Sequence, residues 1–131
     1  MRKPDKITQY WIKHAAYDLE SAKVMLDGCR YLYVTFMCQQ AIEKLLKAII
    51  TTISKEFPPR IHNLTRLSEL AKVNSKLDQK QKDLLAILTP FCIETRYAEY
   101  TEKMSKLADK KLAVEYLQKT KELLKCLKEM I

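Results

Sequence analysis

Residues 5–27 read DKITQYWIKHAAYDLESAKVMLD, and apolar side chains recur within them at steps of three and four positions. Such steps place side chains on one face of an α-helix. The resulting stripe consists of Ile7, Trp11, Ala15, Leu19, Ala22 and Leu26. Pro4 suits a first helical turn, Asp5 complements the helix dipole, and Gly28 is a helix stop signal. We therefore predict an amphipathic helix from about Asp5 to Asp27.

The rest of the chain predicts four more helices. The residue before a proline resists the helical conformation, so the second helix ends before Pro58. Asn63 is a suitable N-cap for a short third helix. Pro90 removes one backbone hydrogen bond, and we expect it to kink the fourth helix. The expected ranges are about Tyr31–Ser54, Leu64–Val73, Asp78–Thr101, and Ser105 to the end of the chain.

Composition supports an all-α fold. The chain has 131 residues, a length typical of one domain, and only one glycine. Sheets joined by tight turns need residues that tolerate positive φ, and one glycine supplies almost none. Four long helices with short connections predict a single domain over residues 1–131. We expect an antiparallel up-and-down four-helix bundle, with the 64–73 helix as a short extra element.

Charge and cysteine content restrict the function classes. The net charge of +8 is distributed along the chain and forms no basic arm. It permits contact with nucleic acid or nucleotide phosphates, although lysines also serve solubility. The longest aliphatic run, Leu84–Leu88, is too short to span a membrane, and no signal peptide is recognisable. We expect a cytoplasmic protein with four free thiols, at Cys29, Cys38, Cys92 and Cys126.

The densest group of polar residues lies in residues 36–48, FMCQQAIEKLLKA. On a helix, four of its side chains fall within an arc of about 100°. They are Gln40, Glu43, Lys44 and Lys47. One interpretation is a solvated face with Glu43 and Lys47 as an i,i+4 ion pair. The other is that these groups line a groove for a phosphate-bearing ligand.

A second polar group lies in residues 94–100, ETRYAEY. On the expected helix, Arg96 and Tyr100 are i,i+4 neighbours, and Tyr97 faces an adjacent side. A guanidinium beside a phenol can bind a phosphate or stack on a base. Arg96 can equally pair with Glu99 and hold the bundle together. Both interpretations stay open at this stage.

Other catalytic patterns are absent from the sequence. His14 lies beside the apolar stripe of the first helix, and His62 precedes the short helix, where it can cap or hydrogen-bond locally. No spacing of His, Cys, Asp and Glu resembles a zinc site, and no glycine-rich phosphate loop is possible. We therefore expect neither a metal nor a cofactor.

Several motifs together resemble the HEPN domain family, a nucleotide-binding domain of higher eukaryotes and prokaryotes. They are Trp11 with AAYDL at 15–19 and Ala22, then FxxQQAxEKxxKA at 36–48, HNL at 62–64, and Arg96-Tyr97. The resemblance covers roughly residues 5–130. It implies an up-and-down four-helix bundle that is usually dimeric.

The resemblance implies two kinds of function. Many HEPN proteins resemble metal-independent ribonucleases, in which a histidine follows an arginine after four to six residues. Here those positions are Thr101, Glu102 and Lys103, so ribonuclease activity is not expected unless His62 replaces the missing histidine. A second branch consists of short proteins encoded beside a minimal nucleotidyltransferase. In some toxins of the family this partner adds AMP to a tyrosine near the arginine, and Tyr97 and Tyr100 are the candidates here.

We therefore expect a nucleotide- or RNA-binding homodimer that acts with a minimal nucleotidyltransferase in a toxin–antitoxin-like module. The expected ligand-binding residues are Gln40, Glu43, Lys44, Lys47, Arg96, Tyr97 and Tyr100. The alternatives are a metal-independent ribonuclease that uses His62 and a structural dimerisation module without a ligand.

Overall fold

The computed structural model describes residues 5–93 and 97–131, and all regular structure in these ranges is helical. The all-α class is therefore confirmed. The α-helices are α1 (Lys6–Asp27), α2 (Tyr31–Ser54), α3 (Leu64–Leu70), α4 (Gln79–Leu88), α5 (Ala98–Leu107) and α6 (Lys110–Lys128). Two short 3₁₀ turns, η1 (Asn74–Lys76) and η2 (Thr89–Phe91), precede and follow α4.

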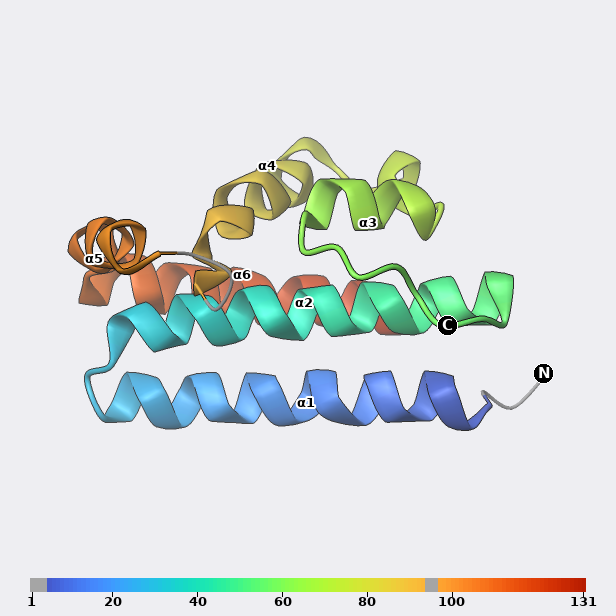
Figure 1. Ribbon diagram of the computed structural model, residues 1–131, viewed down its shortest axis with the longest axis horizontal. Helices are drawn as coiled ribbons and strands as arrows, with labels where there is room; N and C mark the ends of the chain where they lie inside the picture. Colours follow the sequence, from blue (N-terminus) through green and yellow to red (C-terminus); the bar gives the residue numbers. More distant parts are fainter. Residues whose placement is uncertain (1–4, 94–96) are drawn as a thin grey trace.

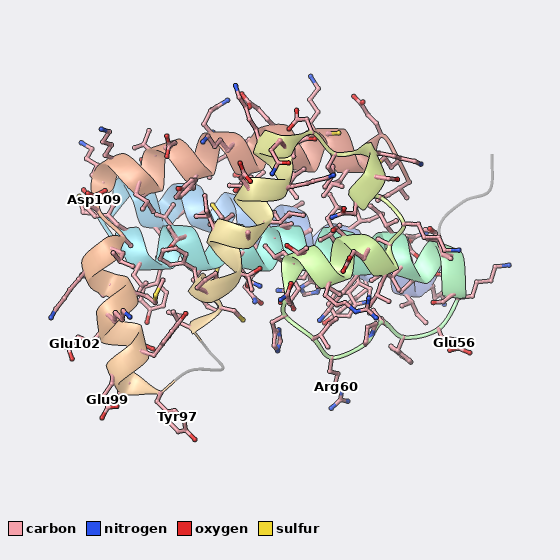
Figure 2. The ribbon with its side chains drawn as sticks, turned by 90° about the horizontal axis from the view of Figure 1, so that it is seen from above. Glu56, Arg60, Tyr97, Glu99, Glu102 and Asp109 are labelled. Atoms are coloured by element: carbon pink, nitrogen blue, oxygen red, sulfur yellow. The ribbon has the colours of Figure 1, made fainter. Side chains whose placement is uncertain are left out.

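Helix α2 lies at the centre of the bundle. Figure 1 shows α1 antiparallel to α2 along its whole length, with α6 beside α2 and α3 and α4 above it. Figure 1 shows α1 running opposite to α2 and α6, whereas Figure 2 shows the short α4 crossing above the long helices. Every residue from Val34 to Thr51 except Met37 and Lys44 is buried. This central position determines the surroundings of the polar side chains on α2.

Short polar side chains begin most of the helices. The Asp5 carboxylate accepts a hydrogen bond from Thr8 N, and the Asn63 side chain accepts one from Arg66 N. Each bond satisfies a backbone donor that a helix N-terminus leaves without a partner. The bounds of α1 and α2 agree with the ranges expected from the sequence. At the end of α1, Cys29 rather than Gly28 adopts the left-handed conformation, with φ of 59°.

The expected kinked helix over 78–101 is wrong. Helix α4 ends at Leu88, and the chain then forms the 3₁₀ turn that contains Pro90. A proline ring clashes with the carbonyl four residues earlier and offers no N–H, so the α-helix stops here instead of bending. A separate α5 begins after Tyr97, whose backbone is extended.

Two other expected bounds also differ. Helix α3 ends at Leu70, before Lys72 takes a positive φ of 60°. The last helix begins at Lys110 rather than Ser105, because the Asp109 side chain caps it by accepting from Leu112 N. Residues 98–107 belong to α5, so the bundle carries two short additional helices where the sequence predicted one. Among the described residues, no helix has the length and apolar character needed to cross a membrane.

Candidate functional site

A buried carboxylate, Glu43, connects side chains from α2 and from the loop before α3. Its Oε2 lies 3.0 Å from Lys47 Nζ, one turn along the same helix. Its Oε1 accepts a hydrogen bond from Gln39 Nε2 at 3.1 Å and lies 2.9 Å from His62 Nδ1. The Glu43 side chain is 5% exposed, whereas the His62 side chain is 42% exposed. The imidazole is therefore where this buried group reaches the surface.

The two glutamines extend the network toward η2. Gln39 Nε2 also donates to the backbone carbonyl of His62 at 3.0 Å, which ties the loop to α2. Gln40 Nε2 donates to Gln39 Oε1 at 2.8 Å and lies 3.7 Å from Cys92 Sγ. We call this set the Glu43 cluster; it consists of Gln39, Gln40, Glu43, Lys47, His62 and Cys92.

The two lysines of α2 face different neighbours. Lys44 Nζ forms an ion pair with Asp18 Oδ2 of α1 at 2.6 Å. Lys47 Nζ lies 5.5 Å from the centre of the Trp11 ring, in addition to its contact with Glu43. Trp11 of α1 is therefore next to the Glu43 cluster, through its contact with Lys47. Both ammonium groups already have a carboxylate partner.

One interpretation of the sequence placed the polar side chains of α2 on a solvated face, but in the structure that face is buried. Gln40, Glu43 and Lys47 are 9%, 4% and 5% exposed, and Lys44 is half-buried. The predicted ion pair between Glu43 and Lys47 is present. The arc of about 100° derived from helix geometry is also polar, but it faces α1 and the 58–63 loop rather than water. These contacts are long-range, so helix periodicity cannot detect them.

The second polar group is only partly described. Arg96 lies outside the described residues. Tyr97 precedes α5 with its side chain 88% exposed, and Figure 2 shows it projecting away from the bundle. Tyr100 is half-buried against the main core. Tyr97 has an extended backbone and α5 begins at Ala98, so Tyr97 is not part of the expected helix.

The structure also brings together three possible metal ligands that the sequence spacing hides. One ligand atom each from Glu43, His62 and Cys92 lies within 4.8 Å of the others. Carboxylate, imidazole and thiolate are ligand types that Zn²⁺ accepts. However, the Lys47 ammonium, 3.0 Å from Glu43, opposes a divalent cation at the same carboxylate. The present contacts therefore favour a hydrogen-bonded cluster over a metal centre.

Comparison with known proteins identifies the family. A family model described as the HEPN domain matches residues 8–130. The chain belongs to the HEPN domain family. No curated protein matches it.

Among solved structures, the HEPN domain is similar to the protein TT1696 from Thermus thermophilus. The TM-score is 0.80 at 19% sequence identity, and the match covers 97% of this chain and 100% of that one. At this level of identity the likeness shows the fold alone.

Sequence reasoning missed several members of the Glu43 cluster. Gln39 lies outside the polar arc, and Cys92 was expected only as a buried thiol. His62 was expected to act as a local cap or, in the alternative, as the catalytic histidine of a ribonuclease; its contact with Glu43, 19 positions away, was not predicted. The sequence held one signal for this contact: the EK motif at 43–44 and the HNL motif at 62–64 are both among the motifs that resemble the HEPN domain family.

Proposed function

We propose that this HEPN domain binds a nucleotide or a nucleic-acid strand, with the Glu43 cluster as the structural centre of the site. The observation that supports this proposal is a buried, charged network that reaches the surface at His62. Burying an ion pair adds little stability compared with apolar residues of similar size. A network of this kind in the central helix is therefore better explained by a role in binding than by a requirement of the fold.

The contacts assign different roles to the proposed residues. Lys44 and Lys47 are paired with Asp18 and Glu43, so their role is to hold the site in place. Gln40 supports the cluster from the inside. Direct contact with a ligand falls to His62, whose Nδ1 faces Glu43 and whose Nε2 is the remaining polar atom of an exposed ring.

Additional groups for the ligand come from nearby loops. Arg60 is exposed two residues before His62, and Figure 2 shows it projecting outward along the same edge of the view as Tyr97. Tyr97 offers an exposed ring for stacking on a base. Arg96 and Tyr100 remain proposed ligand-binding residues on the basis of the sequence. The net charge of +8 favours a polyanion over a neutral ligand.

We further propose a minimal nucleotidyltransferase as the protein partner, in a toxin–antitoxin-like module. This proposal is supported by membership of the HEPN domain family. Co-purification of the two proteins tests the pairing. Incubation of both proteins with ATP, followed by mass spectrometry of tryptic peptides, tests AMP transfer to Tyr97 or Tyr100. In that step the tyrosine hydroxyl oxygen bonds to the α-phosphorus of ATP, the hydroxyl loses its proton, and pyrophosphate leaves.

A specific observation favours a second candidate, a metal-independent ribonuclease. The Glu43 carboxylate lies 2.9 Å from His62 Nδ1, an arrangement that orients an imidazole for proton transfer at Nε2. We nevertheless expect cleavage to be absent or very weak, since the positions where a histidine would follow Arg96 hold Thr101, Glu102 and Lys103. Robust cleavage of single-stranded RNA that disappears in His62→Ala would favour the ribonuclease.

Binding is tested with fluorescently labelled single-stranded RNA and labelled AMP, by anisotropy at several salt concentrations. We expect His62→Ala and Arg96→Ala each to weaken binding about tenfold, and we expect the melting temperature of Arg96→Ala to change little. His62→Ala also removes a partner of the buried Glu43 carboxylate, so circular dichroism must show that this variant is folded at the temperature of the binding assay. Lys119→Ala is the matched control, because it removes an exposed cation from α6, away from the Glu43 cluster. The proposal fails if wild-type protein binds neither probe, or if the control loses as much affinity as the two variants.

A further inference from the structure

A hollow lined by aromatic rings lies beside the first turns of α1. Its volume is about 420 Å³, within the range of small-molecule sites. It is lined by Lys6, Ile7, Tyr10, Trp11 and Phe57. We propose that this aromatic pocket holds a nucleobase. The inference rests on the proposed function, and it names the part of the ligand that the Glu43 cluster itself does not contact.

The exposure of the rings is the first argument. Phe57 is 79% exposed and Tyr10 is 54% exposed, so two large apolar faces meet solvent at one place. An exposed apolar patch of this kind commonly marks a binding surface. One wall of the pocket is the start of α1, and the other is Phe57 in the loop that follows α2.

The local sequence also holds Phe57 in place. Phe57 follows α2 and precedes Pro58-Pro59, and Pro58 is buried. A residue before proline is restricted to extended backbone conformations. The exposed ring is therefore presented by a stiff segment, which lowers the entropy lost when a ligand stacks on it.

The ring geometry suits a planar heterocycle. Tyr10 and Trp11 meet at 82° with centroids 5.3 Å apart, so one ring presents its face where the other presents its edge. A base entering this corner can stack on one ring and contact the edge of the other. A hollow farther along α1 has a single aromatic ring, that of Tyr17, in its lining. The hollow beside Asn63, Arg66 and Pro90 and the groove between α1 and α6 have no aromatic ring in their linings.

Trp11 connects the pocket to the Glu43 cluster. Lys47 of that cluster lies 5.5 Å from the centre of the indole ring, and the same indole lines the pocket. The indole Nε1 is a buried donor with no hydrogen-bond partner among the described residues. Lys6, on the pocket wall, supplies a cation for a phosphate attached to the base.

The test uses Trp11, the single tryptophan of the chain, as its reporter. Adenosine, AMP, UMP, ribose 5-phosphate and a single-stranded RNA are titrated separately, with N-acetyltryptophanamide as the correction for light absorbed by the bases. We expect saturable quenching with each probe that carries a base and none with ribose 5-phosphate. If AMP binds as tightly as RNA, the ligand of the pocket is a free nucleotide. If RNA binds far more tightly, the ligand is a nucleotide within an RNA strand.

Variants test the pocket directly. We expect Phe57→Ala and Tyr10→Ala each to weaken AMP binding about fivefold or more. Neither ring is buried, so both variants should fold. Tyr33→Ala is the matched control, since Tyr33 is 48% exposed at the opposite end of α2.

Three outcomes would overturn the inference. The first is equal quenching by ribose 5-phosphate, and the second is wild-type affinity in Phe57→Ala. The third is no quenching by any probe, together with a sedimentation change in Phe57→Ala, which would identify the pocket as a protein contact.

The two proposals can fail separately. If nucleotide binding by anisotropy still depends on His62 while Trp11 emission stays constant, the pocket assignment is wrong and the proposed function stands. If anisotropy also detects no binding, both fail.

Discussion

Glu43 shows how much of a residue's role depends on its neighbours. On an isolated helix it would form a surface ion pair with Lys47, an interaction of small value. In the structure the same pair is buried, and the carboxylate also accepts from Gln39 and faces His62. Removing one partner therefore leaves an incompletely compensated charge inside the bundle.

We predict that Lys47→Met lowers the free energy of unfolding by about 3 kcal/mol. Lys119→Met is the control, because Lys119 and Glu115 form an i,i+4 pair that is exposed. That variant should change stability by no more than about 0.5 kcal/mol. Urea denaturation followed by circular dichroism measures both. In the double variant Glu43→Leu/Lys47→Met we expect part of the loss to return, and equal effects of the two single variants would contradict the prediction.

Cys38 gives a prediction about pH. Burial raises the pKa of the Cys38 thiol from 9.0 to about 12, although the Thr120 hydroxyl and the Lys121 charge partly oppose the shift. Well below pH 9.0 the thiol keeps its proton in both folded and unfolded chains. Above that value the unfolded thiol ionises first, so stability falls as pH rises toward 12.

We expect this loss to be missing in Cys38→Ala. The variant creates a cavity and starts less stable, so the slope of unfolding free energy against pH is compared rather than its value. Between about pH 9.5 and 10.5 the wild-type slope should be steeper by up to about 1.4 kcal/mol per pH unit. Parallel slopes would show that Cys38 ionises equally in both states.

Among the helices, the segment after α4 departs most from the sequence-based expectation. The apolar pattern continues through Pro90, which suggested a bent but continuous helix. The structure instead has a 3₁₀ turn at Thr89–Phe91 and a new helix from Ala98. The turn places Phe91 and Cys92 in buried positions, and Cys92 reaches the Glu43 cluster. The break in the helix thus helps to build the candidate site.

Helix α6 depends on its own N-cap. The Asp109 carboxylate accepts a hydrogen bond from Leu112 N at 2.8 Å. We predict that Asp109→Ala costs about 1 kcal/mol of stability, because that donor loses its partner and α6 packs along α2. Asp109→Asn should retain most of the stability, since an amide oxygen also accepts this bond. Thermal unfolding compares the two, and an Asn variant as unstable as the Ala variant would implicate the charge rather than the cap.

At the scale of the whole molecule, assembly remains a prediction. A dimer surface needs large apolar side chains that the core of one copy leaves exposed, and Tyr10, Tyr31, Tyr33 and Phe91 are the candidates in the sequence. Phe91 is in fact buried at 3% exposure, and Tyr31 packs against the core. Tyr10 and Tyr33 are about half exposed, and Tyr17 and Val24 add exposed apolar positions at seven-residue spacing on α1. The part of α1 that carries Tyr17 and Val24 is the surface that a second copy would cover, and Tyr10 is left to line the aromatic pocket.

We predict that sedimentation at micromolar concentration gives about twice the chain mass of 15.4 kDa. Tyr17→Glu should shift the protein toward the monomer, because two copies of the charge would meet at a symmetric contact. Glu115→Gln, on the exposed face of α6, is the control and should leave the mass unchanged. A wild-type monomer would exclude any site shared between two subunits.

The sequence by itself determined the helical class, the bounds of α1 and α2, and the Asn63 cap, because periodicity and capping depend on residues a few positions apart. It did not determine that Gln40, Glu43 and Lys47 are buried, nor that Glu43, His62 and Cys92 meet. These facts depend on α1, the 58–63 loop and η2 closing around α2. Burial is a property of what packs against a helix face, and a polar face that is enclosed has the same periodicity as one in water. Only the tertiary structure therefore turned an apparent surface pair into a candidate site.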